Sequence, residues 1–243
     1  IYARKYQLQR AEGSSFRGQV VTKEAPLPKH FIRRSLGFER RESEGSDILV
    51  ATGVTPERRS VVAFQRKVRV GNYDYFETSD GLMIRAYAVS EVRKVDRPAG
   101  VGAKERWVHV DLGEQTLTAY EGDEPMLATL VSTGREPGMT PTGVFRIQSK
   151  FITTAMRDQP PEEDAYSIED VPWTQYFDQN IALHGAFWHS GFGLVRSHGC
   201  VNLSPPDARW LFGFLASAVP AGWHAVMPGV GETPQGSVVY ITE

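Results

Sequence analysis

Cysteine and histidine side chains gather in one short stretch in the C-terminal part of the chain. His184, His189 and His198 are three of six histidines in the sequence, and the stretch also holds Cys200, the single cysteine. A thiol at its ordinary pKa of about 8.5 is mostly protonated at neutral pH and is then a poor nucleophile. A neighbouring imidazole can take the proton and leave a thiolate–imidazolium pair, which activates cysteine for acyl transfer. The stretch therefore predicts nucleophilic chemistry at Cys200.

The three histidines differ as candidates for the base. His184 ends a predicted apolar strand over 180–183 and precedes Gly185, a placement that presents an imidazole rigidly across a cleft. His198 lies two residues before Cys200, and we interpret it as an orienting or structural residue. We therefore predict His184 as the base and keep His189 as the reserve candidate.

The backbone before Cys200 also suits acyl transfer. Gly199 allows a tight turn at the nucleophile. Successive N–H groups over 198–200 can point at the oxyanion that develops during attack on a carbonyl.

Two other interpretations of the stretch remain open from the residues alone. His184, His189, His198 and Cys200 offer the nitrogen and sulfur ligands that zinc takes, but their spacings are not those of the familiar structural zinc fingers. We therefore predict neither a metal nor another cofactor. A lone cysteine can also be a small buried hydrophobic residue, and histidines can simply pack in a core.

The elements that position these residues are mostly strands. Val108, Val110 and Leu112 alternate with polar residues, which indicates a half-buried strand. Ser204 fits an N-cap, Pro205 the first helical position and Asp207 a reciprocal capping carboxylate, which predicts a helix over about 205–217. Further strands are predicted over 116–120, 126–132, 144–147, 223–227 and 237–241, with a corner at Thr140–Gly143. The segment 149–180, with Pro160–Pro161 and acidic residues 162–164, is predicted to be a long lid or binding loop.

The first hundred residues predict a different kind of unit. Residues 1–40 are basic and lack periodicity, and 40–53 is predicted to be loop. Strands are predicted over 61–64, 67–70, 73–76 and 82–89, and 98–102 is predicted to be a linker. The fold class expected is mainly β: a β-rich domain with one helix after the nucleophile loop, preceded by a small β-rich N-terminal module.

Charge supports a division of the chain near residue 103. Residues 1–104 hold 20 Lys and Arg against 12 Asp and Glu, whereas 105–243 hold 7 against 17. We predict a basic module over 1–103, with a role in tethering to an anionic surface, and a catalytic domain over 104–243. No stretch approaches the roughly 20 apolar residues of a membrane-spanning helix, so no integral membrane segment is expected. The chain starts at Ile1, and we expect a form from which an export signal has been removed.

The order of these residues resembles a known family. His184-Gly185, a gap, and then Ser197-His198-Gly199-Cys200-Val201-Asn202 is similar to the motif of the L,D-transpeptidase catalytic domain of the YkuD type. The resemblance extends over roughly residues 105–230 and includes the corner at Thr140–Gly143. Residues 1–104 carry no family motif.

The resemblance assigns roles by position. It implies Cys200 as the acyl-accepting nucleophile and His184 as the general base, with the Gly185 carbonyl orienting the imidazole. It implies the N–H groups of Gly199 and Cys200 as oxyanion donors. Loop-shaping and substrate-contacting roles are implied for Ser197, His198, Asn202, Trp188, Arg196, Tyr176 and Trp173.

The resemblance also implies the reaction. Cys200 would attack the carbonyl of the L-centre of diaminopimelate in a tetrapeptide donor stem, and an amine from a neighbouring stem would resolve the thioester into a 3→3 peptidoglycan cross-link. The protein would be exported to the periplasm or cell wall, would be a target of carbapenems and would need no nucleic acid. Alternatives are resolution by water, as in an L,D-carboxypeptidase, attachment of an envelope protein, or peptidoglycan binding without catalysis.

Overall fold

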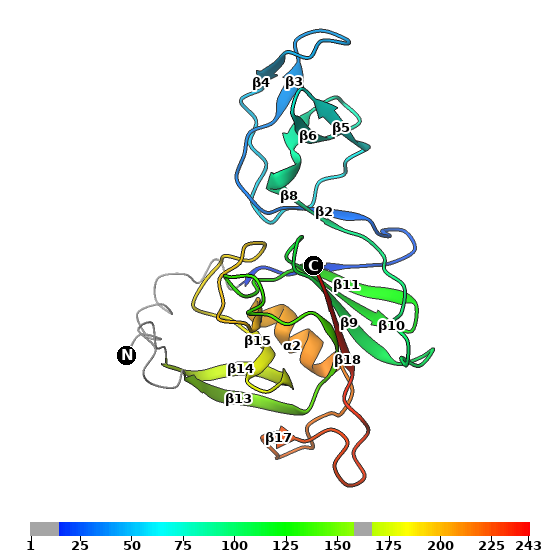
Figure 1. The fold of residues 1–243 in the computed structure, drawn as a ribbon, viewed down its shortest axis with the longest axis vertical. Coiled ribbons are helices and arrows are strands. Elements are labelled where there is room, and N and C mark those ends of the chain that lie inside the picture. The colour runs from blue at the N-terminus through cyan, green and yellow to red at the C-terminus, as the bar shows by residue number, and fades with distance from the viewer. Residues whose placement is uncertain (1–14, 158–166) are drawn as a thin grey trace. The chain divides into compact units, whose positions relative to one another are not determined.

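The computed structural model describes residues 15–157 and 167–243, and the chain divides into two compact units (Figure 1). Of the described residues, the larger unit comprises 15–22 and those from Val95 to Glu243, and the smaller unit is Lys23–Lys94. These bounds differ from the predicted division at residues 103 and 104. The reason is backbone pairing, because residues before Thr22 add a strand to a sheet of the larger unit.

The first sheet of the larger unit is largely a meander. Alternating apolar residues and the turn after Asp111 form its central hairpin, as the sequence predicted. β18 joins this hairpin in parallel, so the C-terminal strand lies beside β9. In the order of the sheet, the strands are β1 (Gln19–Val20), β11 (Glu124–Leu130), β10 (Thr116–Glu121), β9 (Arg106–Asp111), β18 (Val238–Thr242) and β12 (Gly143–Arg146).

The second sheet corrects the predicted loop over 149–180. Most of that segment forms two long antiparallel strands, whose apolar side chains pack in separate clusters on the two faces of the sheet. Pro160–Pro161 and the acidic residues 162–164 lie outside the described residues. In the order of the sheet, the strands are β16 (Val201–Leu203), β15 (Ile181–Gly185), β14 (Ser167–Asp178), β13 (Ser149–Arg157) and β17 (Ala225–Val226). β17 is shorter than the strand predicted over 223–227.

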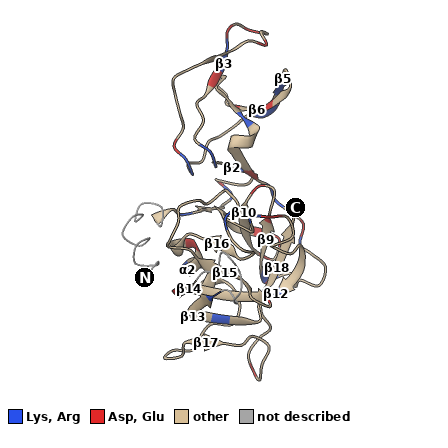
Figure 2. Ribbon diagram, turned by 60° about the vertical axis from the view of Figure 1, so that its left-hand side comes forward, with Lys and Arg blue, Asp and Glu red and all other residues tan. Residues whose placement is uncertain are grey.

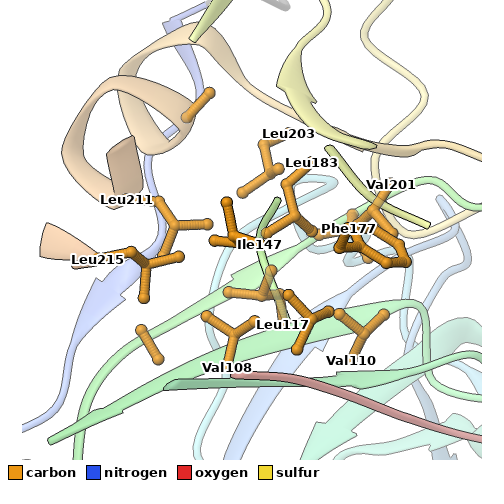
Figure 3. Close-up of a cluster of buried hydrophobic side chains, with 14 of the residues drawn as sticks. Val108, Val110, Leu117, Ile147, Phe177, Leu183, Val201, Leu203, Leu211 and Leu215 are labelled. Atoms are coloured by element: carbon orange, nitrogen blue, oxygen red, sulfur yellow. The ribbon is translucent and has the colours of Figure 1, made fainter. Parts of the chain in front are cut away.

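Helix α2 (Pro205–Phe214) follows the nucleophile loop as predicted, although it ends three residues earlier. Ser204 caps it by accepting the Asp207 N–H, and Pro205 occupies the first turn. Leu211 and Leu215 point from the helix region toward Val108 and Leu117 of the first sheet and Leu183 of the second (Figure 3). One core therefore joins α2 to both sheets and fixes the strands that lead to Cys200. Within the described residues, no helix is long and apolar enough to cross a membrane.

The C-terminal end of α2 is closed by a buried lysine. Lys150 of β13 is fully buried, and its ammonium donates to the carbonyl oxygens of Phe212, Leu215 and Ala216 at 2.8–3.0 Å. Burial lowers the pKa of Lys150 to about 8, so the group is still mostly charged at neutral pH. A cation at this position complements the partial negative charge of the helix C-terminus.

The Asp207 carboxylate serves the N-terminal segment and not the predicted reciprocal cap. Both carboxylate oxygens accept the Gly18 N–H at 3.0 Å, and one also accepts the Thr129 hydroxyl at 2.6 Å. Burial raises the pKa of Asp207, although these hydrogen bonds oppose the shift. The carboxylate thereby joins β1, β11 and α2. A Cβ on Gly18 would lie 2.6 Å from the Ala128 carbonyl oxygen and 2.6 Å from Thr129 Cβ.

A pair of glycine substitutions tests this join. Gly18→Ala is expected to lower the free energy of unfolding by about 2 kcal/mol, because the methyl group collides with the backbone of β11. Gly213→Ala, in α2 with open space around the added methyl, is expected to raise it by roughly 0.5–1 kcal/mol. Urea unfolding followed by circular dichroism measures both. Equal effects of the two substitutions would show that residues 15–22 do not pack on β11.

The strands of the smaller unit differ from the predicted ones. Some form where none was predicted, and one predicted strand does not form. Residues 29–32 and two strands within 39–51 pair in sheets, although 40–53 was predicted to be loop; charged side chains there hide the alternation that pairing requires. Only an isolated bridge at Val61 marks the strand predicted over 61–64. A 3-10 turn, η2 (Ala86–Ala88), interrupts the strand predicted over 82–89. The strands are β2 (Lys29–Ile32), β3 (Glu39–Arg41), β4 (Leu49–Ala51), β5 (Arg66–Val70), β6 (Tyr73–Glu77), β7 (Met83–Arg85) and β8 (Val89–Val92).

Candidate active site

An open cavity of about 250 Å³ lies in the larger unit over the strands that lead to Cys200. It brings together most of the residues that the sequence predicted for the site, although they come from separate segments. The lining residues are Met156, Ile168, His184, Trp188, His189, Arg196, Ser197, His198, Cys200 and Asn202.

Two parallel strands set the central side chains. His184 of β15 and Asn202 of β16 are register partners, so their side chains leave the sheet on the same face. Their neighbours Leu183, Val201 and Leu203 point the other way and belong to the core. Cys200 directly precedes β16, which places its side chain in the same cavity as His184.

The His184 imidazole is fixed in one orientation. Its side chain is almost fully buried and stacks on Trp188 with ring centroids 5.6 Å apart. Nδ1 lies 3.2 Å from the Gly185 carbonyl oxygen, the contact that the resemblance implied. A proton on Nδ1 donates to that oxygen and leaves the Nε2 lone pair available to accept a proton.

Burial lowers the pKa of His184 to about 4, and the Gly185 carbonyl opposes the shift only in part. The resting imidazole is therefore neutral at pH 7. The Cys200 thiol donates to the Asn180 carbonyl oxygen over 3.6 Å, as a protonated thiol does. Burial disfavours the charged imidazole, so His184 alone is neutral, and the thiolate–imidazolium pair stays a prediction.

Short hydrogen bonds hold the backbone of the nucleophile loop. The Ser197 hydroxyl donates to the Cys200 carbonyl oxygen at 2.5 Å and accepts the Gly199 N–H at 3.1 Å. Thr140 donates to the Gly199 carbonyl oxygen at 2.7 Å. Gly199 has φ +134°, and a Cβ there would lie 2.6 Å from the Met139 carbonyl oxygen. Glycine is thus required at this position, as predicted.

The hydrogen bond to Ser197 changes the expected oxyanion site. Because the Gly199 N–H is already bonded to the Ser197 hydroxyl, it is not available as the second oxyanion donor in this arrangement. The role of the Cys200 N–H as an oxyanion donor stays a prediction.

His189 does not suit the role of reserve base. Its Nδ1 accepts the Gly191 N–H at 3.0 Å, and its Nε2 lies 2.9 Å from the Asn202 carboxamide. Both ring nitrogens are therefore engaged away from Cys200. The alternative of a zinc site finds no support in the described ranges, where no group of three or more His, Cys, Asp or Glu side chains is arranged to hold a metal ion.

Two arginines contact or belong to the nucleophile loop. The exposed His198 accepts a hydrogen bond at Nε2 from the guanidinium of Arg135, which fits a role in shaping the loop. Arg196 is exposed and lines the cavity, and its side chain packs against Gly191, where a Cβ would meet Arg196 Cδ at 2.3 Å.

The three aromatic residues that were predicted to contact the substrate lie in different surroundings. Trp188 lines the cavity. Tyr176 packs in the same small cluster as Cys200. Burial raises the pKa of its phenol, and so does the negative charge that Cys200 carries when its thiol is ionised. Trp173 was predicted to contact the substrate, but it packs on the core beside Phe212 of α2. Its side chain leaves β14 on the opposite face of the sheet.

Several contributors were missed from the sequence. Met156 and Ile168 form part of the cavity wall from β13 and β14, and Asn180, Arg135 and Thr140 hold the nucleophile, His198 and the loop. The hairpin of β13 and β14 gave no strand signal, so its residues could not be assigned. Thr140 stood in a noted corner, but a contact to a residue 59 positions away has no local pattern.

Comparison with known proteins decides the family. Residues 105–241, more than half of the chain, match the model of the YkuD family, the L,D-transpeptidase catalytic domain. The chain belongs to this L,D-transpeptidase family. The matched residues begin at the first strand of the central hairpin and end in β18, so they include the whole nucleophile loop.

Individual L,D-transpeptidases share less than a third of their aligned residues with this chain. L,D-transpeptidase 1 of Mycobacterium tuberculosis is 28% identical over 108 residues, which cover 42% of this chain and 43% of that protein. The putative L,D-transpeptidase YciB of Bacillus subtilis is 24% identical over 149 residues, covering 51% of this chain and 74% of that protein. A solved L,D-transpeptidase from Mycobacterium smegmatis is 17% identical with a TM-score of 0.46, covering 78% of this chain and 71% of that one. The chain thus spans less than half the length of L,D-transpeptidase 1 of Mycobacterium tuberculosis.

Proposed function

We propose that this protein is a cysteine-dependent L,D-transpeptidase that forms 3→3 cross-links in peptidoglycan. Family membership supports an acyltransferase of the cell envelope. The single observation that carries the proposal is the shared cavity of Cys200 and His184, with His184 Nδ1 held at the Gly185 carbonyl and Nε2 left to accept a proton.

The first half-reaction forms the acyl-enzyme. Nε2 of His184 takes the Cys200 thiol proton as the sulfur attacks the carbonyl of the L-centre of diaminopimelate in the donor tetrapeptide. The Cys200 N–H stabilises the oxyanion. The bond to the terminal D-Ala breaks, its amine leaves with the proton from His184, and a thioester remains on Cys200.

The second half-reaction transfers the acyl group. An amine of a neighbouring stem attacks the thioester, His184 takes a proton from that amine, and the Cys200 thiolate leaves and is reprotonated. No metal or organic cofactor takes part in these steps. If water replaces the amine, the same intermediate gives an L,D-carboxypeptidase; if a lysine of an envelope protein replaces it, the result is a protein attached to peptidoglycan.

Product analysis tests the proposal. The protein is incubated with purified disaccharide-tetrapeptide, and products are separated and identified by mass spectrometry. Dimers with a 3→3 link are the expected product. Tripeptide monomers alone would replace the proposal by the carboxypeptidase. A folded protein that gives no product and no carbapenem adduct on Cys200 would favour peptidoglycan binding without catalysis.

The smaller unit is proposed to tether the enzyme to the wall, which would place the protein in the periplasm or cell wall. Its residues 23–94 hold 14 Lys and Arg against 10 Asp and Glu, and β5 carries Arg66, Lys67 and Arg69 (Figure 2). Arg85 stacks over the exposed ring of Tyr73 at 3.6 Å from its centroid, a surface suited to sugars and anions. Binding of the full chain to isolated sacculi should fall as salt rises; binding that is independent of salt would refute the electrostatic tether.

A further inference from the structure

One buried hydroxyl holds the peptide unit that joins Gly199 to Cys200. Thr140 is 3% exposed and lies in the corner that leads into β12. Its Oγ1 donates to the Gly199 carbonyl oxygen at 2.7 Å and accepts the Gly134 N–H at 2.9 Å. The direction of both hydrogen bonds is fixed, because a backbone N–H can only donate and a carbonyl oxygen can only accept.

This contact sets the direction of the Cys200 N–H. The carbonyl of Gly199 and the N–H of Cys200 belong to one peptide unit, and that unit is trans. In a planar trans peptide the C=O and N–H bonds point in opposite directions. Thr140 does not line the Cys200 cavity, and together with Gly134 it belongs to the wall of a separate hollow. With the carbonyl turned to Thr140, the N–H is turned to the opposite side of the loop, where the cavity lies.

The flanking peptide units are held by the hydroxyl of Ser197. That hydroxyl accepts the Gly199 N–H and donates to the Cys200 carbonyl oxygen. Three successive peptide units, 198–199, 199–200 and 200–201, are therefore fixed by side-chain hydroxyls. Of the three, the unit held by Thr140 is the one whose N–H belongs to the nucleophile.

Close packing keeps the Thr140 hydroxyl in place. A Cβ on Gly134 would lie 2.5 Å from Met139 Cβ and 3.1 Å from Thr140 Oγ1, so the two backbone segments are in contact there. The segment around Gly134 is also tied to the nucleophile loop, since the Arg135 N–H donates to the Ser197 carbonyl oxygen at 2.9 Å. The hydroxyl thus bridges two backbone segments that are already fixed to each other, and this holds the Gly199 carbonyl in one direction.

We infer that Thr140 is a positioning residue for acyl transfer, whose hydroxyl orients the 199–200 peptide so that the Cys200 N–H points at the oxyanion. The hydrogen bond that the Gly199 carbonyl accepts also polarises the amide and makes its N–H a stronger donor. A donor that is oriented in advance stabilises the oxyanion without reorganisation during the reaction. Thr140 lies outside the cavity, so it acts through the loop. The inference rests on the proposed function for the reaction at Cys200.

Two reactions of the same thiol test this role in the full chain. Carbapenem acylation passes through a tetrahedral oxyanion, whereas alkylation by iodoacetamide displaces iodide from a saturated carbon and forms none. Thr140→Val keeps the shape of the side chain and removes the hydroxyl. It is expected to lower the limiting rate of acylation about 10- to 100-fold, less than the loss of a whole oxyanion donor. The carbapenem concentration at half the limiting rate, and the rate of alkylation, should stay within about twofold of wild type. Intact mass follows both reactions.

Two further variants serve as controls. Thr140→Ser keeps the hydroxyl and should acylate within about threefold of the wild-type rate. Thr174 of β14 is also fully buried and donates to a backbone carbonyl, that of Val171, at 3.1 Å, but it does not line the cavity. Thr174→Val should leave both rates unchanged. The inference is overturned if Thr140→Val slows acylation and alkylation equally, if it slows neither, or if Thr140→Ser is as slow as Thr140→Val.

A structural readout on the wild-type protein does not require the valine variant to fold. In a crystal structure of the carbapenem acyl-enzyme, the thioester oxygen should lie about 3 Å from the Cys200 nitrogen, with the Gly199 carbonyl still bonded to Thr140. A thioester oxygen elsewhere, or a carbonyl turned away from Thr140, would overturn the inference. Wild-type acylation separates the two possible failures. Its absence refutes the proposed function, whereas a normal wild-type rate with an unaffected Thr140→Val refutes the inference alone.

Discussion

Cys200→Ala is expected to abolish 3→3 cross-linking and covalent carbapenem capture, since no other thiol exists in the chain. His184→Gln should lower the rate of acylation about 10²- to 10⁴-fold, the usual contribution of a general base, because glutamine cannot take the thiol proton. Acylation is followed by intact mass, and the slow rate of the glutamine variant by the time course of the adduct. Both variants should keep the wild-type unfolding temperature to within a few degrees.

Histidine controls make this result specific. His224 is exposed, does not line the cavity and bonds the Thr153 carbonyl oxygen, so His224→Gln should acylate at the wild-type rate. His189→Gln should also acylate, because its ring nitrogens serve Gly191 and Asn202 and accept nothing from Cys200. A loss for His189→Gln as large as for His184→Gln would show that the base was misassigned.

The sequence was informative where a local pattern carries the structure. Alternation at Val108 and Val110 identified the central hairpin, and Ser204-Pro205 identified the start of α2, because both depend on neighbouring residues. The motif around Cys200 located the loop and predicted the two partners of the proposed proton transfer, which line one cavity. Gly199 was informative because its conformation and its contact with Met139 exclude any side chain.

The sequence was uninformative where long-range pairing decides. β1 joins the larger unit through Gly18 and Asp207, which are 189 residues apart, so a boundary drawn from charge could not include it. A deletion meant to remove the smaller unit must therefore keep residues 15–22. Trp173 was assigned to the substrate because it is aromatic and lies near Tyr176. Its backbone has φ +57°, and the ring packs on the core.

Neutrality of the resting His184 has a consequence for the pH dependence of stability. Its pKa in the folded protein is about 4, against an ordinary value of 6.5. Between these values the unfolded chain binds a proton that the folded chain excludes, so the free energy of unfolding decreases as pH falls from 6.5 to 4. A shift of this size corresponds to about 3 kcal/mol at the acid end of the window. His184→Gln removes this contribution. Between pH 6.5 and 4, its free energy of unfolding should therefore fall by about 3 kcal/mol less than that of the wild type.

Urea unfolding of wild type and His184→Gln at pH 7 and pH 4 measures the difference. The two other buried histidines with lowered pKa values, His30 and His109, are common to both proteins and cancel. Equal losses in the two proteins would mean that the imidazole is not desolvated as the structure has it.

The same neutrality predicts the acid limb of the rate. Since Nε2 stays unprotonated until pH approaches 4, carbapenem acylation of the folded protein should fall only below about pH 5, and not near 6.5. Pulse acylation followed by intact mass, over a range of pH in which circular dichroism shows the folded state, gives the midpoint. A midpoint near 6.5 would contradict a neutral resting pair and restore the charged thiolate–imidazolium pair. A midpoint near 4 means that the thiol proton moves to His184 only as the carbonyl is attacked. Cys200 would then stay a protonated, weakly nucleophilic thiol until a donor stem is bound.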